Sequence, residues 1–259
     1  MEQEAREGFL APKSHPVMFD SPVPLQCAYK AIEVDRAFLL EYGVGIRLLI
    51  FDLDGTLIDS SIDICDALNH TIRPYGLAEV TVGETITLVG EGVARLIGKL
   101  IEQRAPDLDL PTLIERFTEY YAAHLTDHTR AYPGTGKVLQ ALEGRRKAVI
   151  TNKHESLSLR ILGALDLLKY FDYVAGGDTS PERKPSPVPI LNVLSRFGTA
   201  PEEALVVGDS IYDIEAGRAA GVRTVAALYG YGAAGFSDGA DYSIEQIGGL
   251  TEIVRLLDH

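Results

Sequence analysis

Four short apolar runs constrain the fold of this chain more than any other feature. They lie at residues 47–51, 148–150, 204–207 and 224–227. Runs of this length without polar alternation are typical of strands that are buried on both faces. Helical patterns occupy the intervals between the later runs, at residues 155–168, 187–197 and 211–220. This alternation of strand and helix predicts an α/β fold with a parallel sheet and right-handed crossovers.

Polar side chains follow three of these runs. Asp52 and Asp54 come after the first run, Thr151 after the second and Asp209 after the third. In an open α/β sheet, ligands bind outside the carboxyl ends of the strands. Chance could put one acid at such a position. Three strand ends that carry such groups predict one shared site at that edge of the sheet.

The interval between the first two runs predicts an inserted helical domain. About a hundred residues separate these runs, which is far more than one crossover helix needs. Helical periodicity recurs within the interval, at residues 61–75, 92–104 and 111–125. We therefore expect a core made of residues 46–60 and 132–259, with a helical lid at residues 61–131. Residues 1–45 form an N-terminal extension to which the sequence assigns no role.

Composition argues against several classes of partner. The formal net charge of the 259 residues is −13, so nucleic acid and acidic membrane surfaces are not expected partners. No apolar stretch is long enough to span a membrane, and the first residues lack the apolar core of a signal peptide. Cys27 and Cys65 have no paired spacing, which argues against zinc and fits a reducing cytosol. We therefore expect a cytoplasmic protein.

Asp52 and Asp54 lie unusually close together for two like charges. Each raises the proton affinity of the other, so something must compensate for their repulsion. Asp52 could attack phosphorus and form an acyl phosphate; alternatively, it is an ordinary helix-capping or turn residue. The spacing lets Asp54 reach the leaving-group oxygen, first as general acid and then as general base. Gly55 permits a sharp turn here, which Thr56 could fix with a hydrogen bond.

Asp209 indicates a cation that would offset this repulsion. Ligand sets made only of oxygen in an open site suit Mg²⁺. We expect Mg²⁺ beside Asp52 and Asp209, where it would also neutralise a phosphate and allow an anionic nucleophile to approach. Asp213 follows four residues later, in the first turn of the next helix. It could support the waters of the metal, or it could simply stabilise the positive end of the helix dipole.

A phosphate group also needs fixed donors. Thr151 offers a hydroxyl group and Asn152 offers its backbone N–H. Lys184 offers a positive charge in a loop that Pro185 and Pro187 stiffen. A single lysine is usually a solvated surface residue, so only the surrounding pattern makes Lys184 a candidate ligand.

Four sequence blocks together resemble the haloacid dehalogenase superfamily. They are DLDGTL (52–57), ITNK (150–153), KPSP (184–187) and VGDSIYDI (207–214), in the order that the family uses. The resemblance implies a Rossmannoid core, with the insertion as a helical C1 cap. It also implies that Asp52 is the nucleophile, Asp54 the acid/base, Thr151 and Lys184 phosphate ligands and Asp209 a Mg²⁺ ligand. The backbone carbonyl of Asp54 would be a further metal ligand.

Within that superfamily the chain is similar to the phosphoglycolate phosphatases. The blocks that carry this similarity are DLDGTLIDS (52–60), VGEGV (89–93), GDSIYDIEAGRAAG (208–221) and YGYG (229–232). The similarity implies a phosphatase for a small phosphorylated metabolite, 2-phosphoglycolate. A substrate that bears a carboxylate would need a cation from the cap, and Arg95 and Lys99 are the candidates. Exposed helix cations often make no specific contact.

Three alternatives share most of these residues. A sugar-phosphate mutase of the β-phosphoglucomutase type, or a pyrophosphatase, would use the same aspartyl-phosphate step with another acceptor or donor. A receiver-like domain that only accepts a phosphoryl group also clusters Asp, Thr and Lys at strand ends. A receiver has no need of a general acid, so Asp54 and the long insertion argue against it. The oligomeric state is left as monomer or homodimer.

Overall fold

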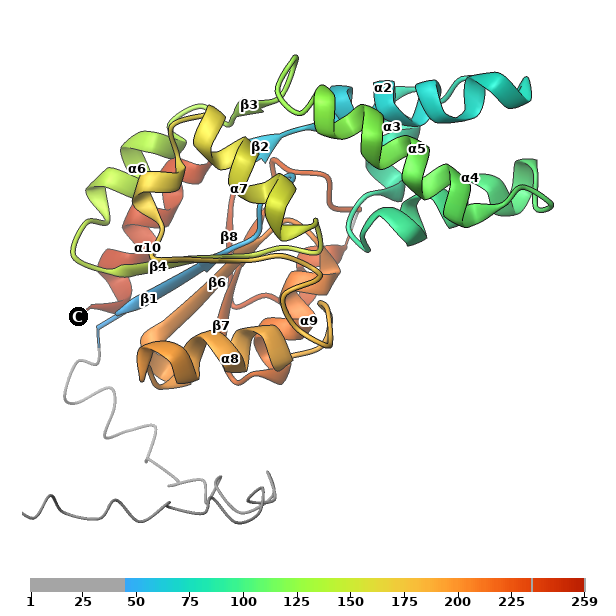
Figure 1. Cartoon of the computed structure of the whole chain (residues 1–259). Helices are drawn as coiled ribbons and strands as arrows, with labels where there is room; N and C mark the ends of the chain where they lie inside the picture. The colour runs from blue at the N-terminus through green and yellow to red at the C-terminus, as the bar shows by residue number, and fades with distance from the viewer. Residues whose placement is uncertain (1–44, 234, 259) are drawn as a thin grey trace, which may run out of the picture.

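A six-stranded parallel sheet forms the centre of the computed structural model, which describes residues 45–233 and 235–258 (Figure 1). The strand order is β5-β4-β1-β6-β7-β8. The strands are β1 (Leu48–Phe51), β4 (Arg146–Ile150), β5 (Tyr173–Ala175), β6 (Ala204–Gly208), β7 (Arg223–Ala227) and β8 (Tyr242–Ile244). The predicted α/β fold with a parallel sheet is confirmed. Apart from its last residue, the expected N-terminal extension at residues 1–45 lies outside the described residues.

Helices cover both faces of the sheet, which explains why its inner strands contain continuous buried apolar runs. All four residues of β1 are buried. Leu49 and Phe51 belong to the apolar cluster that includes α6 (Thr135–Ala141), α7 (Glu155–Ala164) and α10 (Leu250–Leu257). Leu48 and Ile50 belong to the opposite cluster, which includes α8 (Val188–Phe197) and α9 (Ile211–Ala219). Burying both faces of a strand removes the polar alternation that a half-exposed strand would show.

A separate group of helices is inserted after β1 and stands to one side of the sheet (Figure 1). The group consists of α2 (Ser61–Ile72), α3 (Val82–Leu88), α4 (Val93–Arg104) and α5 (Leu110–Ala123). Their apolar faces meet around Leu68, Ile97 and Leu113, which are fully buried. A short antiparallel pair, β2 (Ile58–Asp59) and β3 (Arg130–Ala131), carries the chain out of the core and back into it.

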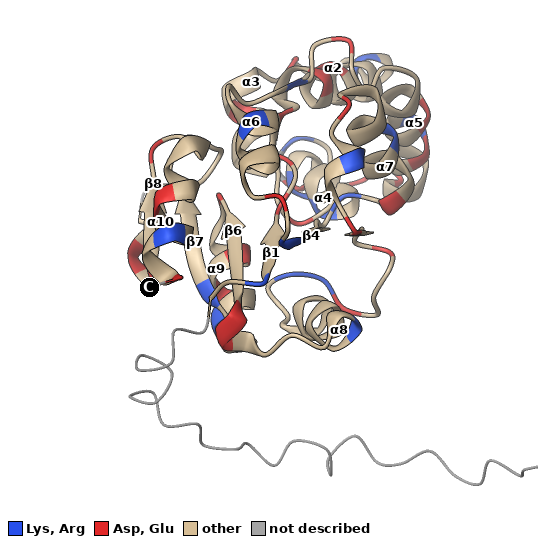
Figure 2. Cartoon of the chain, turned by 90° about the vertical axis from the view of Figure 1, so that its left-hand side faces the viewer, with Lys and Arg blue, Asp and Glu red and all other residues tan. Residues whose placement is uncertain are grey.

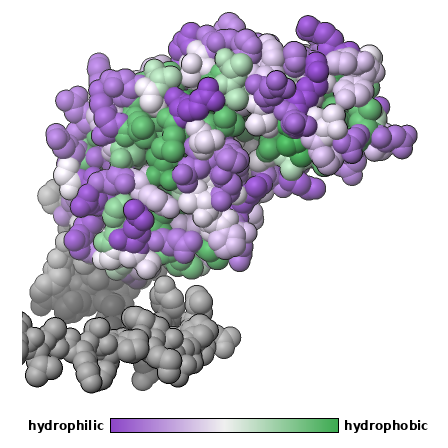
Figure 3. Space-filling model, viewed as in Figure 1, coloured by the Kyte–Doolittle hydropathy of each residue, from purple (hydrophilic) through white to green (hydrophobic). Residues whose placement is uncertain are grey.

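The visible surface of the molecule is mostly hydrophilic. Hydrophilic residues cover most of the face in Figure 3, and hydrophobic residues show as smaller areas on both the core and the insertion. Asp and Glu are spread over the core and the insertion alike (Figure 2). Within the described residues, no helix has both the length and the apolar character needed to cross a membrane.

The sequence predicts the inner strands better than the edge strands. The four apolar runs are β1, β4, β6 and β7, which occupy adjacent positions in the sheet. Strands β5 and β8 were not predicted. Each has three residues and lies at an edge, so each buries too little apolar surface to stand out from a loop.

Some expected helix boundaries are wrong. The pattern at 155–168 predicts one helix, but α7 ends at Ala164, because Asp166 adopts a left-handed φ of 57°. The expected helix at 61–75 is α2 followed by a 3-10 turn that contains Pro74. Helices α3, α6 and α10 were not predicted. In the described part of the chain, the remaining 3-10 turns are Leu168–Tyr170, Pro201–Glu203, Phe236–Gly239 and Ile247–Gly249.

Asp63 fixes the base of the insertion. It lies in the first turn of α2 and is 2% exposed. Its carboxylate accepts the backbone N–H of His128 at 2.9 Å and the backbone N–H of Thr129 at 2.8 Å. The Thr129 hydroxyl donates to it at 2.7 Å. The start of the insertion is thereby tied to the segment that returns to the core.

We predict that Asp63→Ala lowers the free energy of unfolding by about 2–4 kcal/mol, because it leaves buried N–H groups without an acceptor. Denaturant unfolding followed by circular dichroism would measure this loss. Asp66→Ala is the matched control, because Asp66 is exposed on the same helix, and it should change stability by less than about 0.5 kcal/mol. Equal effects of the two substitutions would contradict the assigned role of Asp63.

Candidate active site

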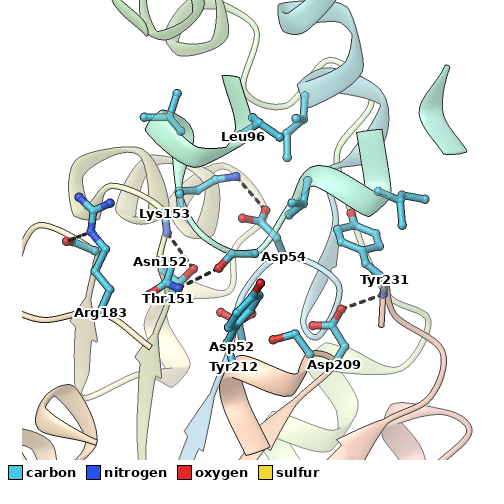
Figure 4. A pocket seen from close by; sticks show the side chains of 18 of the residues that line it. Asp52, Asp54, Leu96, Thr151, Asn152, Lys153, Arg183, Asp209, Tyr212 and Tyr231 are labelled. Atoms are coloured by element: carbon cyan, nitrogen blue, oxygen red, sulfur yellow. Dashed lines mark hydrogen bonds and ion pairs between the residues drawn. The ribbon is translucent and has the colours of Figure 1, made fainter. Parts of the chain in front are cut away.

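A cavity of about 560 Å³ lies where the carboxyl ends of the strands face the insertion. The core lines it with Asp52, Asp54, Thr151 and Asp209. The insertion contributes apolar side chains to the lining, among them Leu96, Val93, Phe117 and Tyr121. Figure 4 shows the labelled aspartates near one another, with Asp54 joined to Lys153 and Asp209 joined to Tyr231. The strand-end residues that the sequence singled out therefore share one cavity.

Asp52 directly follows β1 and lies deep in this cavity. Lys184 Nζ lies 2.8 Å from Asp52 Oδ1. This contact is an ion pair, and among the described residues no other donor reaches this oxygen. Burial raises the pKa of Asp52 from its usual 3.8 to about 6; Lys184 opposes the rise, and the charges of Asp213 and Asp54 add to it.

Asp209 follows β6 and is 2% exposed. One carboxylate oxygen accepts the Thr56 hydroxyl at 2.8 Å, and the other accepts the backbone N–H of Tyr231 at 2.8 Å. Burial raises the pKa of Asp209 well above its usual range, and the neighbouring carboxylates raise it further. Gly55 has a φ of 85°, and a Cβ there would lie 2.0 Å from the Asp209 carboxylate. Only glycine fits this close approach.

Asp213 completes a cluster of three carboxylates. It lies in the first turn of α9, where it accepts the backbone N–H of Ser210 at 3.1 Å and also binds Lys184. Asp52, Asp209 and Asp213 each offer an oxygen within 4.8 Å of the others. Lys184 supplies one positive charge against three negative ones. The excess of negative charge on these clustered oxygens fits a divalent cation held by oxygen ligands.

The three expected phosphate ligands lie together beside Asp52. Thr151 follows β4 and lines the cavity, with 4% of its surface exposed. The side chain of Asn152 donates to the backbone carbonyls of Gly90 at 2.8 Å and Lys184 at 3.0 Å, so it holds the lysine loop in place. Among the described residues, the backbone N–H of Asn152 has no acceptor. Burial lowers the pKa of Lys184, but Asp213 and Asp52 outweigh this effect and raise it, so the ammonium stays charged.

Asp54 has partners that the sequence did not indicate. Its Oδ1 accepts the Ser60 hydroxyl and also the ammonium of Lys153 at 2.8 Å. Lys153 Nζ donates in turn to Tyr121 Oη on α5, again at 2.8 Å. Burial would lower the pKa of Lys153, but Asp54 and Tyr121 outweigh burial and raise it. The ITNK block contains Lys153, but nothing in the sequence pairs it with Asp54, 99 residues away.

The two expected cap cations differ in their positions. Lys99 lines the cavity and forms an ion pair with Glu91. Arg95 is not part of the lining; its side chain is 68% exposed, and its Nε lies 3.6 Å from Glu91. Their contact with substrate stays a prediction.

The fold and the site together define an α/β protein with an acidic, metal-competent pocket at the carboxyl edge of a parallel sheet. The chain belongs to the haloacid dehalogenase-like hydrolase family, whose model matches residues 49–227.

Several relatives support this assignment. The phosphoglycolate phosphatase of Aquifex aeolicus (strain VF5) is 43% identical over 188 residues, which is 72% of this chain and 86% of that protein. The phosphoglycolate phosphatase of Agrobacterium fabrum is 41% identical over 71% of this chain and 81% of that protein. A crystal structure of a predicted phosphoglycolate phosphatase from Haemophilus somnus 129pt has a TM-score of 0.76 and 30% identity, covering 80% of this chain and 97% of that one. The mutase, pyrophosphatase and receiver alternatives are not favoured.

We predict that Asp52→Asn stabilises the metal-free protein at pH 7.5. The pKa of Asp52 is raised from 3.8 to about 6 in the folded state, so its ionisation costs folding energy that grows from about pH 4 to pH 6 and persists above. Asparagine avoids this cost, and the gain should be about 1–3 kcal/mol at pH 7.5 and vanish near pH 4. Thermal unfolding in EDTA across this pH range measures it.

Asp59→Asn is the contrasting variant in the same experiment. Burial raises the pKa of Asp59, but hydrogen bonds from Ser61 and Tyr231 outweigh burial and lower it overall. Its carboxylate therefore contributes stability above the unfolded pKa, and the substitution should destabilise the protein at pH 7.5. A metal-free Asp52→Asn variant that is less stable than wild type at pH 7.5 would contradict the assigned cost of ionising Asp52.

Proposed function

We propose that this protein is a Mg²⁺-dependent phosphatase that hydrolyses a small phosphomonoester, 2-phosphoglycolate, through an aspartyl-phosphate intermediate at Asp52. The observation that carries this proposal is the buried Asp52 carboxylate, which Lys184 holds through Oδ1 at 2.8 Å and which lines the cavity beside Asp209. A carboxylate that is fixed in position in the wall of a cavity can act as a nucleophile toward a phosphate group bound in that cavity. The names of the relatives support the choice of substrate.

In the first step, an Asp52 oxygen attacks phosphorus and the bond from phosphorus to the ester oxygen breaks. The Thr151 hydroxyl, the Asn152 backbone N–H and the Lys184 ammonium would hold the phosphate oxygens. Thr151 and Asn152 follow β4, and Lys184, in the loop before α8, lies 2.8 Å from Asp52. Fixed donors of this kind stabilise charge that develops in the transition state. Lys184 also holds Asp52 in position, since its ammonium bridges Asp52 and Asp213.

The residues that would hold Mg²⁺ are the Asp52 and Asp209 carboxylates and the backbone carbonyl of Asp54. Asp213 would act on the metal's waters, because Lys184 and Ser210 already engage its carboxylate oxygens. When bound, the ion neutralises charge on the phosphate and on the carboxylate cluster.

Asp54 serves both steps as the proton carrier. It gives a proton to the departing alcohol, then takes one from the water that hydrolyses the aspartyl phosphate. Asp54 follows Asp52 by two residues, and the hydroxyl of Ser60 and the ammonium of Lys153 orient its carboxyl group.

The insertion at residues 61–131 is proposed to act as a cap over a core made of residues 46–60 and 132–259. Its helices line the cavity opposite the aspartates, so their closure would exclude bulk water other than the attacking molecule. We propose a cytoplasmic enzyme, monomeric or homodimeric.

The decisive experiment measures kcat/KM for a panel of small phosphomonoesters. We expect 2-phosphoglycolate to be preferred, and activity to be lost after chelation and restored by Mg²⁺. Asp52→Asn should lower turnover by roughly 10⁴-fold or more while the protein stays folded, because the nucleophile is removed. Substantial turnover by this variant, or full activity without a divalent ion, would refute the mechanism. A preference for another ester would refute only the substrate.

We predict that Asp54→Asn slows both steps with 2-phosphoglycolate, by roughly 10²- to 10⁴-fold. With p-nitrophenyl phosphate the first step needs no proton donor, because p-nitrophenolate is a good leaving group. Rapid mixing should then show a burst of one equivalent of nitrophenolate, followed by slow turnover. Wild-type rates in both phases would exclude Asp54 as the acid and base.

A further inference from the structure

Lys153 is a buried cation that the proposed mechanism uses only to orient Asp54. Its side chain is 8% exposed and lines the cavity. An ammonium group has three N–H donors. One donates to Asp54 Oδ1 and one to Tyr121 Oη, each at 2.8 Å. Among the described residues the third donor has no acceptor, and a buried donor without a partner favours a ligand that supplies one.

Lys153 lies on the side of the site where the leaving group must be. If Asp54 protonates the departing alcohol, the ester oxygen lies within hydrogen-bond reach of the Asp54 carboxyl group. The Lys153 ammonium touches that same carboxyl group, and Tyr121 places it on the side of α5. In 2-phosphoglycolate one carbon atom separates the ester oxygen from the carboxylate. The substrate carboxylate would therefore lie next to this ammonium.

Four other basic side chains in or near the cavity fit this role less well. Lys99 pairs with Glu91, His154 with Asp178, and Lys184 with Asp52 and Asp213, whereas Lys153 pairs with Asp54 itself. Arg183 is exposed and donates through its Nε to the backbone carbonyl of Gly177. In the described part of the chain, none of these four contacts Asp54.

We propose that Lys153, oriented by Tyr121, binds the carboxylate of the leaving group and so selects phosphomonoesters that carry a carboxylate next to the ester carbon. This inference rests on the proposed function. A neutral leaving group would leave the third donor of the ammonium unpartnered in a buried site, and such mismatches discriminate strongly between substrates.

The test compares two substrates and two proteins. Ethyl phosphate replaces the carboxylate of 2-phosphoglycolate with a methyl group and keeps the ester linkage. For wild type and Lys153→Met we would measure kcat/KM on both substrates with Mg²⁺. We expect the preference for 2-phosphoglycolate to fall by roughly 10- to 100-fold in the variant, as when a charge-assisted hydrogen bond is lost. Because the result is a ratio, it cancels any general loss caused by leaving Asp54 without its partner.

Two further variants keep the test sharp. Lys169→Met removes a lysine of the core that is 54% exposed and outside the cavity lining, and it should keep the wild-type preference. Tyr121→Phe keeps the ammonium and removes the hydroxyl that orients it, so the preference should fall severalfold. Thermal unfolding checks that each variant is folded, and Tyr121→Phe carries the test if Lys153→Met is not.

The outcomes separate this inference from the proposed substrate. A wild-type enzyme without preference for 2-phosphoglycolate over ethyl phosphate would overturn both. A wild-type preference that survives in folded Lys153→Met would overturn the inference alone, and so would a preference that Lys99→Met abolishes while Lys153→Met retains it. Loss of the preference in Lys153→Met, with partial loss in Tyr121→Phe, supports it.

Discussion

The repulsion between three neighbouring carboxylates is the constraint on which this structure depends. Asp52, Asp209 and Asp213 offer oxygens within 4.8 Å of one another, and burial raises the cost of ionising the first two. A parallel sheet brings these groups together because its strands end at one edge. Lys184 offsets part of the charge from its position between Asp52 and Asp213. The negative charge that Lys184 does not offset can attract a divalent cation, and the cation can in turn attract an anionic ester.

The sequence predicts those strands that lie inside the sheet and are covered by helices on both faces. Strands β1, β4, β6 and β7 are covered on both faces, so each contains a buried apolar run that stands out, although β4 begins with Arg146 and Lys147 and β7 with Arg223 and Thr224. Strands β5 and β8 lie at the edges and have three residues each, so hydrogen bonding to one neighbour defines them more than hydrophobicity does. The sequence analysis does not predict helix α3, because its seven residues are too few to show a helical period. Its clearest local signal is the capping box of Thr81 and Glu84.

In the site, too, some residues can be predicted from their position after a strand, whereas contacts between residues far apart in the sequence cannot. The strand-end residues Asp52, Thr151 and Asp209 could be placed together from topology alone. The contacts of Lys153 could not, because Asp54 and Tyr121 lie 99 and 32 residues away along the chain. The packing of the core brings Lys153 to Asp54, and the docking of the insertion adds Tyr121 from α5. Arg95 and Lys99 are candidate substrate ligands because they are cations on a helix near the site. Glu91, however, lies close enough in sequence to pair with both.

The insertion and the chemical centre are joined by specific bonds, which links their movements. The Asn152 side chain donates to the carbonyl of Gly90, next to helix α4, and Lys153 donates to Tyr121 on α5. Both donors belong to the loop after β4, which also carries Thr151. If the helices shift relative to the sheet, these bonds must lengthen or the loop must follow. Since Lys153 also binds Asp54, such a shift changes the orientation of the Asp54 carboxyl group. The position of the insertion and the orientation of the Asp54 carboxyl group are therefore coupled through Lys153.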